Sequence, residues 1–312
     1  EVKKISFKEH SGLTLKNLSF ILAADKTHAT LKGFKLEMPS SSISSDSITA
    51  NYTIRRNGEI DMNQLSSVGK INSEGIVPSD LSFILPELKN YSIPMKLNVS
   101  YKLNNGKLNV SNISLFSIDN SIRLTANGYV STFNKAHDWN INIKNFHVGE
   151  SFLNNLFNTA AALKLSLPNP ILNIKKLDVY GKAWGKANKL YAKAALRTNF
   201  GEIRTDIHKD YNNLLANLDT EGLNMGELLS NKNLGKLSLK VKAKGTIQDN
   251  RITSVHAVGK IPSVDYKKYS YKNTNFDVAY NGNSAKGKIS ISDPNIDAEL
   301  TGALNNITGN LK

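Results

Sequence analysis

Residues that commonly carry out catalytic or metal chemistry are few in this chain and widely spaced. The 312 residues contain no cysteine, which excludes thiolate chemistry and disulfides. The six histidines, at positions 10, 28, 137, 147, 208 and 256, include no pair at metal-ligand spacing. We interpret them as surface or strand-end residues, and we expect neither a metal site nor a cofactor.

Two further arrangements have the residue types of hydrolytic sites. The pair His137-Asp138 would need a nucleophile beside the imidazole, which the sequence does not identify. Asp293 and Asp297 could flank a glycosidic bond, but a proline-containing turn and a solvated strand face explain both carboxylates. No GxSxG or glycine-rich phosphate-binding motif occurs. We therefore predict that the chain is not an enzyme.

The chain is strongly basic, with 40 Lys and Arg against 26 Asp and Glu and a net charge of +14. Such a balance favours anionic partners. The lysines are scattered singly, as at Lys240, Lys242 and Lys244, and form no basic block with interleaved aromatics of the kind that binds single strands. We predict no nucleic-acid partner and interpret the charge as a solvated face that tolerates anionic lipid.

Tyr266, Tyr269 and Tyr271 form a cluster among three lysines. The cluster fits either an interfacial or sugar-stacking patch or a strand-turn-strand edge with half-buried tyrosines. We favour the strand edge, because the residues around it alternate as strands do.

Strand patterns dominate the chain. Residues 97–103 alternate apolar and polar, Asn105-Gly106 supplies a turn, and residues 108–110 resume the alternation. An Asn-Gly pair between alternating segments is a strong hairpin signal, and it recurs at Asn57-Gly58 and Asn281-Gly282. The segment GKISISDPNIDAEL, residues 287–300, alternates on both sides of a Pro-containing break. These patterns predict a mostly antiparallel sheet.

Three segments have helical spacing of apolar residues instead: 78–90, 149–164 and 224–232. We expect Pro86 to end or kink the first of them. Each leads through a short connector into a strand, a turn and another strand. A repeated unit of this kind predicts one elongated repeat body, with approximate units 1–77, 78–148, 149–223 and 224–312. The longest apolar run, residues 20–24, is far too short to span a bilayer. Because both ends lie in strand-like sequence, we expect a fragment of a longer protein.

Stacked units would align the apolar faces of successive strands into one stripe, which three short helices could not cover. The alternative is a set of β-sandwiches, in which a second sheet packs about 10 Å away and fills the interior. The periodicity alone is compatible with both architectures.

Several stretches resemble the TamB-like translocation and assembly module proteins of Bacteroidota, within the AsmA-like superfamily. The stretches are residues 12–20, 29–43, 77–90, 222–245 and 264–304. The resemblance implies an envelope protein that crosses the periplasm and is anchored in the inner membrane by a segment absent from this sequence. It also implies a long twisted sheet folded into a U-shaped groove, a role in phospholipid movement, and an Omp85-family barrel as partner through regions outside this sequence.

We therefore predict a mainly β fold: an elongated, twisted, mostly antiparallel β-groove with a few short helices. Its predicted function is to carry phospholipid acyl chains between the inner and outer membranes as part of a bridge-like protein. The candidate lipid-groove residues are the alternating apolar ones: Leu97, Val99, Leu108, Val110, Ile122, Leu124, Ile141, Ile143, Leu177, Val179, Leu237, Leu239, Val241, Ile289, Ile291, Ile296, Ala298 and Leu300.

Two alternatives stay open. The first is a chaperone-like factor for the assembly or secretion of outer-membrane β-barrel proteins, which would add a client strand to a sheet edge. The second is a secreted or surface β-solenoid that binds or cleaves polysaccharide. The second alternative needs a carboxylate pair or an aromatic row on an open face, and the sequence shows neither clearly.

Overall fold

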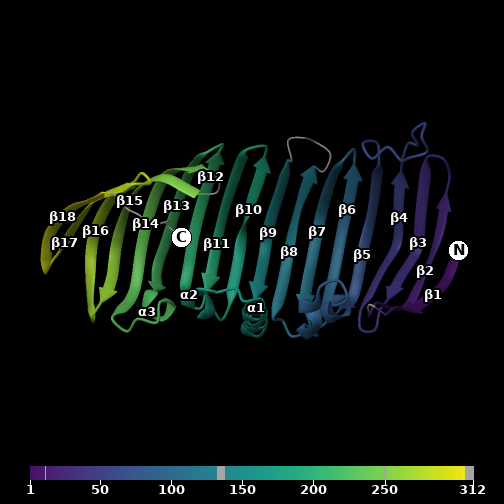
Figure 1. Ribbon diagram of the computed structural model, residues 1–312, viewed down its shortest axis with the longest axis horizontal. Coiled ribbons are helices and arrows are strands. Elements are labelled where there is room, and N and C mark those ends of the chain that lie inside the picture. The colour runs from purple at the N-terminus through teal and green to yellow at the C-terminus, as the bar shows by residue number, and fades with distance from the viewer. Residues whose placement is uncertain (11, 132–137, 249–250, 306–312) are drawn as a thin grey trace. The chain divides into compact units, whose positions relative to one another are not determined.

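The computed structural model describes residues 1–10, 12–131, 138–248 and 251–305. The chain divides into two compact units, Glu1–Ser166 and Leu167–Lys312. Most of their strands and helices are labelled in Figure 1. We refer to them as unit 1 and unit 2 and describe each by itself.

Unit 1 is an antiparallel meander in which each strand pairs with the next one along the chain. Two short 3₁₀ helices, η1 (Pro78–Leu81) and η2 (Pro86–Asn90), interrupt it after β5, and helix α1 (Glu150–Ala162) follows β9. The strands are β1 (Val2–Lys8), β2 (Thr14–Ala24), β3 (His28–Glu37), β4 (Ser42–Asn51), β5 (Ser66–Ile76), β6 (Met95–Asn104), β7 (Lys107–Ser117), β8 (Ile122–Ser131) and β9 (Trp139–Val148).

Unit 2 repeats this plan. Helix α2 (Asn169–Leu172) precedes its first strand, and the one-turn helix α3 (Met225–Leu228) separates β13 from β14. Its strands also pair consecutively and antiparallel. They are β10 (Leu177–Lys186), β11 (Lys189–Thr198), β12 (Gly201–Asp210), β13 (Asn213–Asn224), β14 (Leu234–Gln248), β15 (Arg251–Tyr266), β16 (Tyr269–Tyr280), β17 (Ser284–Asp293) and β18 (Ile296–Asn305).

These meanders confirm the prediction of a mainly β, antiparallel fold with a few short helices. Within either unit, the described strands all belong to one sheet, so the described residues do not form the two facing sheets of a β-sandwich. The open sheet in each unit is the arrangement that a β-groove requires. The predicted repeat boundaries stay a prediction, although helical segments do recur after β5, β9 and β13.

The predicted Asn-Gly turns are also present. Asn105 and Gly106 have φ values of 48° and 73°, and Asn104 pairs with Lys107 across the turn. Positive φ at both central residues is the geometry of the type I′ turn, which matches the twist of the flanking strands. Asn281-Gly282 joins β16 to β17, where the Asn281 side chain accepts a hydrogen bond from the backbone N–H of Ser284 at 2.9 Å.

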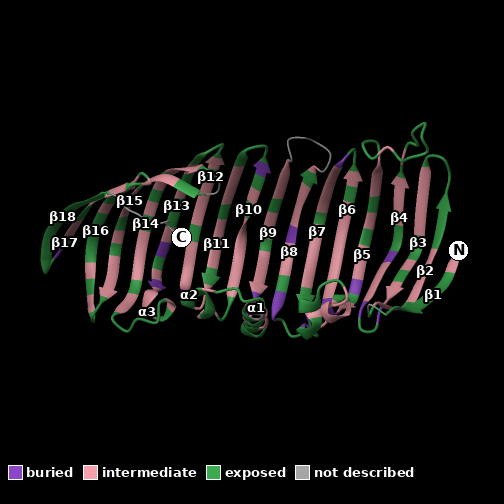
Figure 2. Cartoon of the chain, in the orientation of Figure 1, coloured by how far each residue is buried: buried purple, intermediate pink, exposed green. Residues whose placement is uncertain are grey.

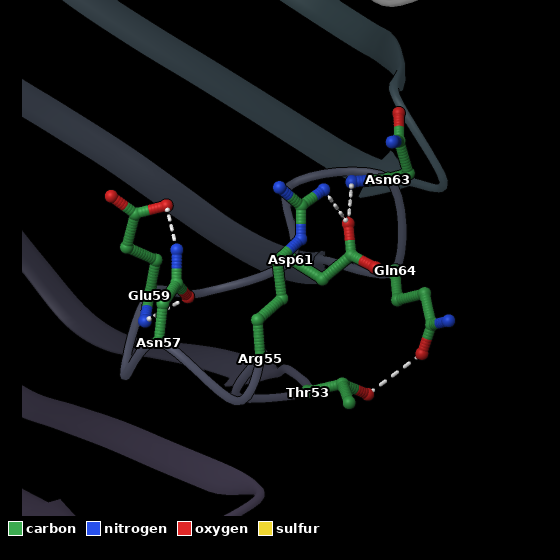
Figure 3. A network of polar contacts seen from close by, with 7 residues as sticks. All are labelled: Thr53, Arg55, Asn57, Glu59, Asp61, Asn63 and Gln64. Atoms are coloured by element: carbon green, nitrogen blue, oxygen red, sulfur yellow. Dashed lines mark hydrogen bonds and ion pairs between the residues drawn. The ribbon is translucent and has the colours of Figure 1, made fainter.

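Asn57-Gly58 lies in the long loop between β4 and β5, at the end of unit 1 away from its helical segments (Figures 1 and 3). Polar contacts hold this loop in a small extra turn, in which a β-bridge joins Ile54 to Ile60. Arg55 forms an ion pair with Asp61 at 2.7 Å, and the Thr53 hydroxyl hydrogen-bonds the Gln64 carbonyl oxygen at 2.8 Å. The loop is therefore ordered by its own side chains.

The helices differ in length from the sequence expectation. Residues 78–90 form two 3₁₀ turns rather than one helix, because Pro86 lacks an N–H and starts a second segment. Residues 149–164 do form a helix, α1, which begins after Gly149. The segment at 224–232 contains only one helical turn, which the Asn224 side chain caps by accepting from the backbone N–H of Glu227 at 3.2 Å.

Candidate functional site

Unit 1 carries a continuous apolar surface on one side of its sheet, which we call its apolar face. Residues that pair directly across neighbouring strands point to the same side of a sheet. One such row runs from β2 to β9 through Leu22, Leu31, Ile48, Gly69, Tyr101, Val110, Gly128 and Ile141. A parallel row runs through Ala24, Ala29, Ala50, Ser67, Leu103, Leu108, Val130 and Trp139.

Unit 2 has an apolar face built in the same way. One row crosses all its strands through Gly181, Ala194, Thr205, Leu218, Val241, Gly259, Phe276, Ile289 and Leu300. The next row, through Ala183, Ala192, Ile207, Ala216, Ala243, Ala257, Val278, Gly287 and Gly302, consists mostly of small residues.

All the candidate lipid-groove residues lie on these two faces. Those between Leu97 and Ile143 share the apolar face of unit 1, and those between Leu177 and Leu300 share that of unit 2. The β17–β18 hairpin illustrates the register, since Ile289 faces Leu300 and Ile291 faces Ala298. The structure thus groups the candidates by face, while their role in lipid binding stays a prediction.

Most of each apolar face is only half-buried. Ile141 in unit 1 keeps 39% of its surface accessible, and Ile289 and Leu300 in unit 2 keep 38% and 68%. Lateral neighbours in the sheet account for the burial that exists, since no second layer of strands faces these rows in the described parts of either unit. Large apolar patches left open in this way usually mark interaction surfaces.

The helical segments of unit 1 lie at one end of its strands, where several strand ends are buried (Figure 2). The buried residues at these strand ends are Met95, Ile122 and Val148. Their chain neighbours Lys96 and Arg123 point to the opposite face of the sheet and are more exposed. Leu153 of α1 and Tyr91 after η2 are buried too, with 7% and 6% of their surface exposed.

Tyr91 contacts helix α1 through its ring and its hydroxyl. Its ring lies 5.5 Å from that of Phe152, and its hydroxyl is 2.9 Å from the hydroxyl of Thr159. These contacts join α1 to the segment after η2, beside the buried strand ends, and the central rows of the apolar face stay open.

The opposite side of each sheet, which we call the polar face, carries amides and charges. In unit 1 the side-chain amide of Asn98 donates from Nδ2 to Oδ1 of Asn72 at 2.7 Å. The side-chain amide of Asn142 donates in the same way to Oδ1 of Asn127 at 3.1 Å. In unit 2 opposite charges meet across strands, as in the pair Lys288–Glu299 at 2.8 Å. Each sheet is therefore two-sided, with one wettable face and one apolar face.

The tyrosine cluster at 266–271 forms a strand-turn-strand edge, as we predicted, on the apolar side of unit 2. Tyr269 pairs with Tyr266 across the turn and packs edge-on against Tyr271 at 4.7 Å. Its hydroxyl donates a hydrogen bond to the Asp293 carboxylate, which also accepts from the backbone N–H of Lys272 at 2.9 Å. The hydrogen bond from Tyr269 is the main reason that the pKa of Asp293 lies below its ordinary value.

The carboxylates considered for hydrolysis do not share a site. Asp293 pairs with Ile296 on the apolar side, whereas Asp297 pairs with Ser292 on the polar side. His137 lies outside the described residues, and its neighbour Asp138 accepts a hydrogen bond from the Tyr129 hydroxyl at 3.1 Å. The described residues include no cluster of three or more potential metal ligands. In the same part of the chain, no helix is both long and apolar enough to cross a bilayer.

Sequence reasoning missed an aromatic row on the polar face of unit 2. Trp184 pairs with Tyr191, and Tyr191 pairs with His208. The signal was present as Tyr180, Lys182, Trp184 and Lys186 at every second position, but the contact depends on the register between three strands.

No protein-family model, curated protein or solved structure significantly matches this chain.

Proposed function

We propose that this chain is a segment of a bridge-like protein that transfers phospholipids across the periplasm between the inner and outer membranes. Its apolar faces would hold the acyl chains, and the headgroups would stay in water. The observation that carries the proposal is the set of registered apolar rows, each of which crosses eight or nine strands of a unit without a covering layer in the described residues.

The energetics suit an acyl chain. Each CH₂ group removed from water is worth about 0.8 kcal/mol, so a chain of roughly 16 carbons gains on the order of 10 kcal/mol on a dry surface. Nine strands spaced about 4.8 Å apart extend a row over about 38 Å. Because the rows consist of apolar and small side chains and contain no charged residue, no position forms a deep trap, and a lipid can slide.

The resemblance to TamB-like proteins of the AsmA-like superfamily supports the cellular setting. It suggests an envelope protein with an inner-membrane anchor and an Omp85-family barrel as partner, both through regions outside this sequence. The open antiparallel sheet in each unit agrees with the architecture which that resemblance implies.

Native mass spectrometry of the purified chain tests lipid binding. We expect phospholipid to co-purify in gentle detergent and to dissociate when the gas-phase complex is activated. A chain that carries no phospholipid after extraction from an envelope fraction would contradict the proposal.

A charged variant with a matched control tests where the lipid binds. Ile289→Asp with Leu300→Asp places two charges on directly facing, exposed positions of the apolar face of unit 2. Asn275→Asp with Ser290→Asp places the same two charges on directly facing positions of the polar face. We expect the first variant to lose bound lipid and transport between vesicles, and the control to retain both, with both proteins folded by circular dichroism.

The assembly-factor alternative predicts the opposite sensitivity. Charges on the apolar face would leave its activity unchanged, because a client strand would bind to backbone groups at a sheet edge. Intact barrel assembly together with intact lipid transfer in the Ile289→Asp, Leu300→Asp variant would therefore count against the lipid proposal.

A further inference from the structure

The polar face of unit 2 carries three aromatic rings in contact, from Trp184, Tyr191 and His208 on β10, β11 and β12. We call them the aromatic row. The centroids of the Trp184 and Tyr191 rings lie 5.9 Å apart with an interplanar angle of 23°, and His208 meets Tyr191 edge-on at 4.6 Å. Leu215, which pairs with His208 and is 48% exposed, extends the row onto β13.

These rings contribute to neither the apolar face nor a buried core. The neighbours of Trp184 in the chain, Ala183 and Gly185, point to the apolar side and pair with Ala192 and Leu190. Trp184 keeps 38% of its surface accessible and the His208 side chain 53%. Exposed apolar residues are ordinary when scattered singly, but contiguous ones on a polar surface indicate a binding surface.

Lysines border the Trp184–Tyr191 pair on both sides. Lys182 pairs directly with Lys193, and Lys186 pairs directly with Lys189. Like charges directly opposite each other destabilise a sheet. Lys189 reaches Asp210 at 3.2 Å, but in the described part of the chain neither Lys182 nor Lys186 forms an ion pair. A bound anion would relieve the repulsion.

We propose that the aromatic row and its lysines bind an acidic saccharide, one whose sugar rings carry carboxylate or phosphate groups. The apolar C–H side of a sugar ring would lie on Trp184 and Tyr191. Lys182 and Lys186 would contact the anionic groups, and the His208–Asp206 pair, 2.9 Å apart, would offer hydrogen-bonding atoms to hydroxyls at the far end of the row. This site lies on the opposite face of the sheet from the proposed lipid surface and does not depend on it.

The observations favour a saccharide over a membrane surface. The two rings are nearly parallel to each other and belong to the paired strands β10 and β11, where each is partly covered by its neighbours, instead of projecting from a loop. A layer of anionic headgroups would lie over Asp206 and Asp210 on β12 as well as over the lysines, and these carboxylates would repel it. A single saccharide can instead place its anionic groups at Lys182 and Lys186 and its hydroxyls at β12.

Tryptophan fluorescence tests the proposal, because the chain has only two tryptophans, Trp139 and Trp184. In a Trp139→Phe background the emission reports Trp184 alone. We expect oligogalacturonate, a chain of carboxylated sugars, to change that emission saturably, and neutral maltohexaose to bind at least about tenfold more weakly. Equal affinity for both sugars, or no response to oligogalacturonate, would overturn the proposal.

Variants test the lysines and the aromatic rings of the site separately. Lys182→Gln with Lys186→Gln should weaken oligogalacturonate binding about tenfold, a loss of about 1.4 kcal/mol. Lys242→Gln with Lys286→Gln removes the same charge elsewhere on the polar face and should leave the affinity unchanged. Calorimetry with Tyr191→Ala should show loss of binding without loss of the folded circular dichroism spectrum.

Lipid vesicles test the alternative that the aromatic row binds a membrane surface. If vesicles of phosphatidylcholine with phosphatidylglycerol shift Trp184 emission while oligogalacturonate does not, the aromatic row is a membrane surface and the proposal is wrong. Equal loss of binding in both lysine variants would show a response to net charge alone and would also overturn it.

Discussion

Consecutive residues of a strand belong to different faces of the sheet, because successive side chains point to opposite sides. Ile289 faces Leu300 on the apolar side, while the next residue, Ser290, faces Glu299 on the polar side. The same division places Trp139 on the apolar face of unit 1 and Trp184 on the polar face of unit 2. A single substitution can therefore test one face without touching the other.

Asp293 should make the stability of unit 2 depend on pH. Its carboxylate accepts hydrogen bonds from Tyr269, from Asn295 at 3.0 Å and from Lys272, and the pKa is lowered in consequence. A lowered pKa contributes stability that is fully present above the unfolded value of about 3.9 and is lost as the pH falls through the folded value.

Urea unfolding of the wild type and of Asp293→Asn checks this prediction. The wild type should be the more stable protein at pH 6, and the difference should stay constant down to about pH 5 and shrink at lower pH. A difference that does not change between pH 6 and pH 2.5 would show that the ionised carboxylate contributes nothing.

Gly259 is required by the close approach of neighbouring strands on the apolar face. A Cβ atom at this position would lie 2.4 Å from the Phe276 ring and 2.6 Å from the backbone oxygen of Lys240. We expect Gly259→Ala to destabilise the protein by about 1–3 kcal/mol, as overpacking does.

Gly302→Ala is the matched control, since nothing lies within 4 Å of the added atom. It should change the free energy of unfolding by less than about 0.5 kcal/mol. Equal unfolding midpoints for the two variants in urea would contradict the packing of Phe276 over Gly259.

At the scale of elements, turns and strands could be predicted from local sequence, but the register between strands could not. The turn at Asn105-Gly106 follows from two residues that tolerate positive φ, and the strand at 97–103 follows from the alternation of apolar and polar residues. The same local reasoning predicted a helical segment at 78–90 that Pro86 ends or kinks, and the structure has two 3₁₀ turns there, the second starting at Pro86.

The same limit applies to the candidate surface: the face of each residue follows from its spacing, but its row depends on the register. That Leu97 and Val99 share a face follows from their spacing, but that Val110, Gly128 and Ile141 share a row depends on bulges that shift the pairing of β7 with β8. The contact between Trp184, Tyr191 and His208 likewise depends on the pairing of three strands, which no single segment of sequence determines.

The packing of helix α1 should contribute to stability mainly through one buried side chain, Leu153. Leu153 is 7% exposed, whereas Leu156 of the same helix is 42% exposed. We expect Leu153→Ala to cost about 2–4 kcal/mol in the free energy of unfolding, because it leaves a cavity beneath the helix.

Leu156→Ala makes the same chemical change on the exposed side and should cost less than about 1 kcal/mol. Urea unfolding measures both, and hydrogen exchange of the amides of α1 should quicken only in the first variant. Equal costs would mean that α1 does not pack on the sheet through Leu153.

At the scale of the whole molecule, the proposed function depends on keeping the two kinds of face distinct. The apolar faces offer area without deep traps, which suits transport of acyl chains. The polar faces carry the charge and, in unit 2, the aromatic row, which suits an acidic saccharide.

Quenching by phospholipids with brominated acyl chains tests the central claim most directly, because each tryptophan reports one face. In Trp184→Phe the remaining Trp139 lies in the apolar row of unit 1, beside Val130. In Trp139→Phe the remaining Trp184 lies on the polar face of unit 2. We predict that bound brominated lipid quenches Trp139 and leaves Trp184 unchanged. Quenching of Trp184 alone, or equal quenching of both, would contradict the assignment of the apolar face as the lipid surface.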